Sequence, residues 1–124
     1  LVALEPDNTE ARHQLASIFS ANNQPDRAIG HLETIVRVDS NDAGARFRLG
    51  HLVAAKGSFR EALDLFEQAY AIAPQQPNVI DSYAWLSYLL NDFEAARSIV
   101  RAGGLYYEGN PEFEQRRRTI LESE

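Results

Sequence analysis

Apolar residues recur at helical spacing along the whole chain, in blocks that alternate with short polar turns. In one block Ala28, Ile29, Leu32, Ile35 and Val36 follow the i, i+3, i+4 and i+7 spacing of a single helix face. Polar residues, glycine or proline at the block ends supply the caps and turns that separate helices. The pattern predicts helices over about 9–22, 25–38, 43–56, 59–73 and 77–90, from about 93 onward, and over 111–122.

The blocks repeat with a period of 34 residues, and no insertion or deletion is needed to keep them in phase. Helix–turn–helix units at a fixed period indicate a stacked helical array, in which neighbouring units bury a core that no single unit has alone. The positions that coincide are Leu15, Leu49 and Tyr83; Ala16, Gly50 and Ala84; Ala28, Ala62 and Ala96; and Leu32, Phe66 and Val100.

This repetition predicts one domain of three full units. The last helix has Arg117-Arg118 where the second unit has Leu49-Gly50, which is typical of a polar helix that covers the end of an array. Leu1–Pro6 aligns with the helix end Ala69–Pro74, so we expect the chain to be a piece of a longer protein. The expected boundaries are the tail of a preceding unit at 1–8, units at 9–42, 43–76 and 77–110, and a capping helix at 111–124.

The second unit shows the repeated residue types most fully. They are Leu49-Gly50, Ala62, Phe66, Ala69 and Pro74. These residues resemble the tetratricopeptide repeat, and the resemblance covers nearly the whole chain. It implies an all-α fold, a right-handed superhelical α-α solenoid of helix–turn–helix repeats, which serves as a protein–protein interaction scaffold and not as an enzyme. Arg12 and Arg46 depart from the family pattern, because a large apolar residue is usual near the start of the first helix.

The pair Gly103-Gly104 interrupts the second helix of the third unit and allows two interpretations. Gly103 stands at the place of Ala69, where a small residue permits a close helix contact, and the helix would continue past it. Alternatively, the helix bends or stops there. We expect a continued but weakened helix, because glycine in a helix interior costs about 1 kcal/mol relative to alanine.

Composition excludes several function classes. A net charge of −6 over 124 residues argues against a dedicated nucleic-acid or anionic-membrane binder. There is no cysteine for a disulfide or a thiolate site, and no apolar run approaches the roughly 18 residues of a membrane span. No glycine-rich phosphate loop, nucleophile elbow or paired metal-binding histidine motif is found, so we expect no catalytic residues, cofactor or metal. The composition does not indicate the cellular compartment of the protein.

The resemblance also implies where a partner would bind. In tetratricopeptide proteins the first helices of successive units line a concave groove in which an extended peptide or a partner helix lies. The residues at the equivalent repeat positions of this chain, which the resemblance implies line the groove, are His13, Gln14, Ser17, Phe47, Arg48, His51, Asp81, Ser82, Trp85 and Tyr88. Only Arg48 suits the basic set with which some family members clamp the acidic tails of heat-shock chaperones, so that function is not expected.

Trp85 is the strongest single candidate for a binding contact, because tryptophan and tyrosine dominate binding hot spots. Tyr88 belongs to the same predicted face. The last helix follows one unit later and could cover both side chains instead, so this alternative stays open. Phe47 has no such cover close by in the sequence, and we expect it to contact a ligand.

Two further groove positions have alternative interpretations. Arg48 could hold a carboxylate of a partner in a two-pronged hydrogen bond, or it could pair with Asp81 on the adjacent helix, which we favour. His13 and His51 could face each other and form a metal site or a pH switch. Because two histidines without a third ligand are weak evidence for a metal, we expect ordinary polar groove residues.

The run Arg116-Arg117-Arg118 is the most basic segment of the chain. It could contact a phosphate or an acidic partner. Glu112, Glu114 and Glu122 stand close to it on the same predicted helix, and the i, i+4 spacing favours a solvated, charge-balanced helix face.

We therefore expect a domain that binds a peptide segment or helix of another protein. The alternative is a structural spacer or a self-association module, in which an exposed repeat end near Leu15–Phe19 makes a homo-oligomer. The segment Asp81–Trp85 is similar to repeats common in bacterial multi-repeat proteins, which suggests a bacterial origin.

Overall fold

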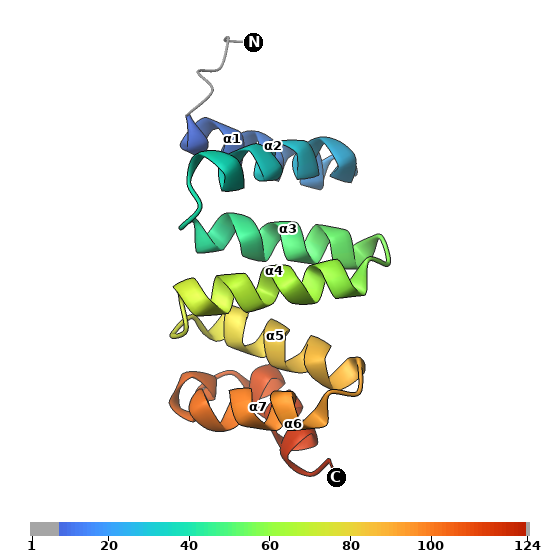
Figure 1. Cartoon of the computed structure of the whole chain (residues 1–124), viewed down its shortest axis with the longest axis vertical. Coiled ribbons are helices and arrows are strands. Elements are labelled where there is room, and N and C mark those ends of the chain that lie inside the picture. Colours follow the sequence, from blue (N-terminus) through green and yellow to red (C-terminus); the bar gives the residue numbers. More distant parts are fainter. Residues whose placement is uncertain (1–7, 124) are drawn as a thin grey trace. The chain divides into compact units, whose positions relative to one another are not determined.

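The computed structural model describes residues 8–123, and all of the regular secondary structure in this range is helical (Figure 1). The predicted tail of a preceding unit lies outside the described residues, apart from Asn8. The elements are α1 (Thr9–Ala21), α2 (Pro25–Val38), α3 (Ala43–Ala55), α4 (Phe59–Ile72), α5 (Pro77–Leu89), α6 (Phe93–Ala102), the 3₁₀-helix η1 (Gly104–Tyr107) and α7 (Pro111–Leu121). These bounds confirm the predicted helices to within one or two residues, except at the end of α6.

Side-chain caps explain where several helices begin. The carboxylate of Asp42 accepts a hydrogen bond from the backbone N–H of Ala45, and Asn8, Asp92 and Asn110 cap α1, α6 and α7 in the same way. Each cap satisfies one of the N–H groups that lack a partner in the first turn of a helix. Where α2 and α5 have no side-chain cap, proline stands at the first helical position, and its fixed φ already suits a helix.

The turn within each helix pair uses a residue with left-handed backbone conformation at the same place of the repeat. Asn23, Gly57 and Asn91 have φ angles of 59°, 91° and 69° and are spaced 34 residues apart. Glycine has no Cβ to clash at positive φ, and asparagine tolerates this region better than most residues. The predicted turns at these positions are confirmed.

The chain forms two compact units, one extending to Leu65 and the other starting at Phe66, with the boundary inside α4. In the first unit α1 packs against α2, and α2 packs against α3. Small residues line the contact between α1 and α2, where Ala16 and Ala28 are completely buried. The larger side chains of Leu32 and Ile35 on α2 are also completely buried and belong to the core of this unit.

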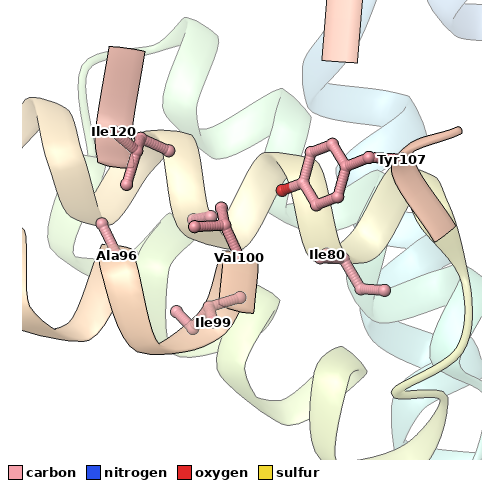
Figure 2. Packing of buried hydrophobic residues seen from close by; sticks show 7 residues of the cluster. Ile80, Ala96, Ile99, Val100, Tyr107 and Ile120 are labelled. Atoms are coloured by element: carbon pink, nitrogen blue, oxygen red, sulfur yellow. The ribbon is translucent and has the colours of Figure 1, made fainter. Parts of the chain in front are cut away.

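In the second unit α5, α6, η1 and α7 surround one apolar cluster (Figure 2). Ile80 and Ala84 come from α5, Ala96, Ile99 and Val100 from α6, Tyr107 from η1 and Ile120 from α7. Figure 2 shows the ring of Tyr107 turned inward toward this cluster. The last helix therefore buries apolar surface of the third repeat, as predicted for a capping helix.

The expected continuation of α6 through Gly103 is wrong. The helix ends at Ala102, Gly103 is its C-cap, and the chain then forms η1. The close helix contact expected at Gly103 is present, because a Cβ placed there would lie 2.9 Å from Cγ2 of Ile80 on α5. A stop at this point lets Tyr107 turn back into the apolar cluster, and burial of that ring offsets the loss of a few helical hydrogen bonds.

Candidate partner-binding site

In the first unit the predicted groove residues His13, Ser17 and Arg48 come together and join α1 to α3. One terminal nitrogen of Arg48 donates to Nδ1 of His13 at 2.8 Å, and the other donates to Oγ of Ser17 at 2.7 Å. Because a guanidinium only donates, Nδ1 of His13 accepts and Nε2 carries the proton. Nε2 then donates to Asp42 at 2.8 Å. Arg48 is thereby held in one orientation by two side chains of α1.

Asp42 anchors this arrangement. Its carboxylate caps α3 through Oδ1 and receives the hydrogen bond of His13 through Oδ2. Burial alone would raise the pKa of Asp42, but hydrogen bonds from His13 and from the backbone N–H of Ala45 outweigh it and lower the pKa below its ordinary value. Asp42 is therefore ionised at neutral pH and fixes both the start of α3 and the tautomer of His13.

A shallow depression of ≈ 360 Å³ lies beside Arg48. Three of the predicted groove residues line it, and Ser20 and Leu52 complete it. His51 also packs edge-on against the ring of Phe47, with the ring centroids 4.6 Å apart. The residues of this depression, which we name the α1–α3 depression, are Ser17, Ser20, Arg48, His51 and Leu52.

Sequence reasoning missed two of these lining residues. Ser20 follows Ser17 by three positions on α1, so it lies on the same helix face, and this spacing could have indicated it. Leu52 is adjacent to His51 in the sequence, and neighbours on a helix point 100° apart. Its place at the edge of the depression depends on how α3 is rotated against α1, which packing decides. Gln14, which was predicted to line the groove, is exposed on α1.

In the second unit Asp81 is buried and bound by the last helix. Nε of Arg116 lies 3.0 Å and 2.9 Å from the two carboxylate oxygens of Asp81, and Arg116 also donates to Glu112 one turn earlier on α7. The hydrogen bond to Asp81 is the largest contribution to the raised pKa of Arg116, although burial opposes it. Arg116 is therefore an anchor of α7, a role that neither interpretation of the arginine run had predicted.

Trp85 and Tyr88 stack on each other, with ring centroids 5.0 Å apart and planes inclined by 19°. Both are half-buried and pack against the apolar cluster that contains Ile120 of α7. The rings are thus partly covered and partly accessible, and a contact of this pair with a partner stays a prediction. Ser82, on the same helix, is half-buried.

No group of three or more histidine, aspartate or glutamate side chains that could hold a metal ion occurs in residues 8–123. His13 is occupied by Arg48 and Asp42, and both ring nitrogens are used. None of the helices in the described part has the length and apolar composition to cross a membrane.

Comparison with known proteins identifies the repeats. Two tetratricopeptide repeat sequence profiles match residues 13–77 and 53–115 and together cover most of the chain. No curated protein sequence matches the chain significantly.

Solved structures share the fold. The type III secretion chaperone SycD of Yersinia enterocolitica, in complex with a peptide of the translocator YopD, has a TM-score of 0.77 at 18% identity, over 94% of this chain and 91% of SycD. The first tetratricopeptide domain of Spaghetti (RPAP3), bound to an HSP90 peptide, has a TM-score of 0.82 at 12% identity, over 97% and 95% of the two chains. PcrH, in complex with the chaperone-binding region of PopD, has a TM-score of 0.75 at 20% identity, over 98% and 94%.

Proposed function

The chain belongs to the tetratricopeptide repeat family, and we propose that it binds a peptide segment or a helix of a partner protein at the α1–α3 depression. The observation that carries this proposal is the fixed orientation of Arg48 beside an open depression. A binding residue that is already ordered loses less conformational entropy when it meets its ligand.

The chemistry of the depression suits a peptide. Arg48 and His51 present N–H groups, Ser17 and Ser20 present hydroxyls, and Leu52 adds an apolar edge. Backbone carbonyls and side-chain carboxylates of a peptide accept from such groups, and charge-assisted hydrogen bonds to a carboxylate are stronger than neutral ones. Three structures of the same fold hold peptides or a peptide region of a partner, which supports this class of ligand.

A displayed library of random peptides tests the proposal. Peptides selected on the wild-type domain should bind the Arg48→Gln variant at least about tenfold more weakly, since one charge-assisted hydrogen bond is removed. His51→Ala should weaken binding too. Arg60→Gln removes an equal charge from an exposed site at the start of α4 and should leave the affinity unchanged. Equal binding of all four proteins would place the site elsewhere.

Self-association is a second candidate, carried by an apolar side chain on α1. Ile18 is 53% exposed, and Leu15 on the same helix is only half-buried. An apolar strip on one repeat end can pair with another copy. Light scattering after size exclusion, over a range of concentrations, should then give a mass that rises with concentration in the wild type and stays monomeric in Ile18→Glu. A constant monomer mass in both proteins excludes this candidate.

A further inference from the structure

A second depression, of ≈ 400 Å³, lies between α1 and α2 and shares no lining residue with the α1–α3 depression. Two arginines and a histidine surround it, and an aromatic ring forms part of its wall. Gly30 leaves room there, because a Cβ at this position would meet no heavy atom within 4 Å. The residues of this depression, which we name the α1–α2 basic pocket, are Arg12, Phe19, Arg27, Gly30 and His31.

Stacking orders one side of the pocket. The rings of Phe19 and His31 are nearly parallel, with planes inclined by 6° and centroids 5.6 Å apart. The guanidinium carbon of Arg27 lies over the Phe19 ring, 5.6 Å from its centroid. A guanidinium that packs on a ring in this way is restrained and can still donate its N–H groups to an anion.

Arg12 orders the other side. It donates to Nδ1 of His31 at 3.1 Å, which leaves the proton of the ring on Nε2. Its Nε–H is buried and has no acceptor among the residues that the structure describes. Burial lowers the pKa of His31, and the positive charge of Arg12 lowers it further, as expected where no anion balances that charge.

No carboxylate in the described part of the chain forms an ion pair with Arg12 or with Arg27. The protein as a whole is acidic, with a net charge of −6. Two arginines that line one pocket without a paired carboxylate therefore form a local excess of positive charge. The pocket therefore offers N–H donors from three side chains to an anion supplied from outside.

The repeat itself does not require these residues. The matching positions, 34 and 68 residues further along the chain, lack the combination of two cations and a stacked histidine. They are Arg46, Val53, Glu61 and Leu65 in the second unit, and Ile80, Ser87, Ala95 and Ile99 in the third. Leu65 and Ile99, which stand where His31 stands, are buried apolar side chains.

We propose that the α1–α2 basic pocket binds a phosphate group, presented by a phosphorylated side chain of a protein partner. A phosphate monoester carries close to two negative charges at neutral pH and accepts hydrogen bonds from several directions. Arg12, Arg27 and the Nε2–H of His31 supply donors from three side chains that line one pocket, and arginine clusters are the usual means by which proteins recognise phosphorylated side chains. A carboxylate carries only one negative charge and two oxygens, so it would accept fewer hydrogen bonds from these three side chains than a phosphate.

Titration of the ¹⁵N-labelled domain with O-phosphoserine, phenyl phosphate and inorganic phosphate tests the proposal by NMR. The backbone amides of Gly30 and His31 should shift in a saturable manner with all three probes. Arg27→Gln, at an exposed position that should not affect folding, and Arg12→Gln should each weaken binding by about tenfold or more. Arg37→Gln, which removes the same charge from an exposed site on α2 outside the pocket, should bind like the wild type.

Glutamate, benzoate and vesicles that contain a phosphoinositide serve as competitors. Two results together support the proposal. The phosphate monoesters bind at least several-fold more tightly than the carboxylates, and Arg27→Gln loses this binding whereas Arg37→Gln keeps it. Equal binding of carboxylates overturns the assignment to phosphate. Equal weakening in Arg27→Gln and Arg37→Gln means that the ions only screen charge. If phosphoinositide vesicles retain the domain but O-phosphoserine and phenyl phosphate do not bind saturably, the phosphate does not come from a protein partner and the proposal is overturned.

Discussion

Arg116 of α7 binds Asp81 of α5 through a two-pronged ion pair, with Nε within 3.0 Å of each carboxylate oxygen. The side chains are 22% and 6% exposed, so both charges are largely removed from water. The two residues are 35 positions apart, and their contact fastens the last helix to the third repeat. The ion pair adds a polar contact to the burial of Ile120, which also holds α7 against the third repeat.

The first prediction concerns this pair. Arg116→Ala should lower the free energy of unfolding by about 3 kcal/mol, because it removes the positive charge and the hydrogen bonds of Arg116 from the buried carboxylate of Asp81. Arg118→Ala, at an exposed position on the same helix, should change it by no more than about 0.5 kcal/mol. Urea unfolding followed by circular dichroism measures both values. A double-mutant cycle with Asp81→Ala should give a coupling energy above about 1 kcal/mol, and additive effects would contradict a direct interaction.

The second prediction concerns two glycines that differ in their surroundings. Gly103→Ala should destabilise the domain by about 1–3 kcal/mol, because the new Cβ would lie 2.9 Å from Cγ2 of Ile80. Gly30→Ala should stabilise it by up to about 1 kcal/mol, because Gly30 is inside α2 and a Cβ there meets no neighbour. Thermal unfolding of the two variants should therefore shift in opposite directions. Because valine lacks the Cδ1 atom of Ile80, which would lie 3.2 Å from the new Cβ, the combination of Gly103→Ala with Ile80→Val should recover only the part of the loss that comes from Cδ1.

The third prediction concerns Tyr83 and alkaline pH. Burial, and then the negative charge of Glu67, raise the pKa of the Tyr83 phenol to about 12. The unfolded chain ionises near the ordinary value of 10.0, so it releases this proton first. The free energy of unfolding should consequently fall as the pH rises from 10 toward 12. The loss should be smaller in Tyr83→Phe. Parallel losses in both proteins across this pH range would exclude a contribution from Tyr83.

The fourth prediction concerns the turns within the helix pairs. Asn91 has a φ of 69°, where a Cβ-bearing residue without a suitable polar side chain is strained. Asn91→Ala should therefore cost about 1 kcal/mol of stability, and Asn91→Gly should be close to neutral or slightly stabilising. The same pair of substitutions at Asn23 should give the same order. Chemical denaturation measures both series, and a stable Asn91→Ala variant would argue against the left-handed turn.

Local sequence determined most of the fold. The 34-residue period, the capping residues such as Asp42 and the turn residues such as Gly57 predict seven α-helices in the described part of the chain, with ends close to those observed. These features act over a few neighbouring residues, so they can be interpreted without knowing the tertiary structure. The end of α6 was the exception, because burial of Tyr107 in the cluster of the second unit competes with helix continuation.

The candidate site was predictable only in part. Repeat phase correctly brought Ser17, Arg48 and His51 to one surface, but whether that surface binds a partner stays a prediction. The hydrogen bonds of His13 to Asp42 and Arg48 were not predicted, since they join residues that are 29 and 35 positions apart. Repeat phase indicates which face of a helix a residue occupies and not which of several polar neighbours it will bind.

The helices, the turns and the repeat could therefore be predicted from the sequence, because the hydrophobic period, the caps and the left-handed turns are properties of short segments. The partners of the charged side chains, in contrast, follow from how the helices pack. Arg116 binds Asp81, whereas Arg12 and Arg27 have no carboxylate partner in residues 8–123. Charge pairing depends on distances of a few ångströms between helices that are far apart in the sequence, and packing sets those distances.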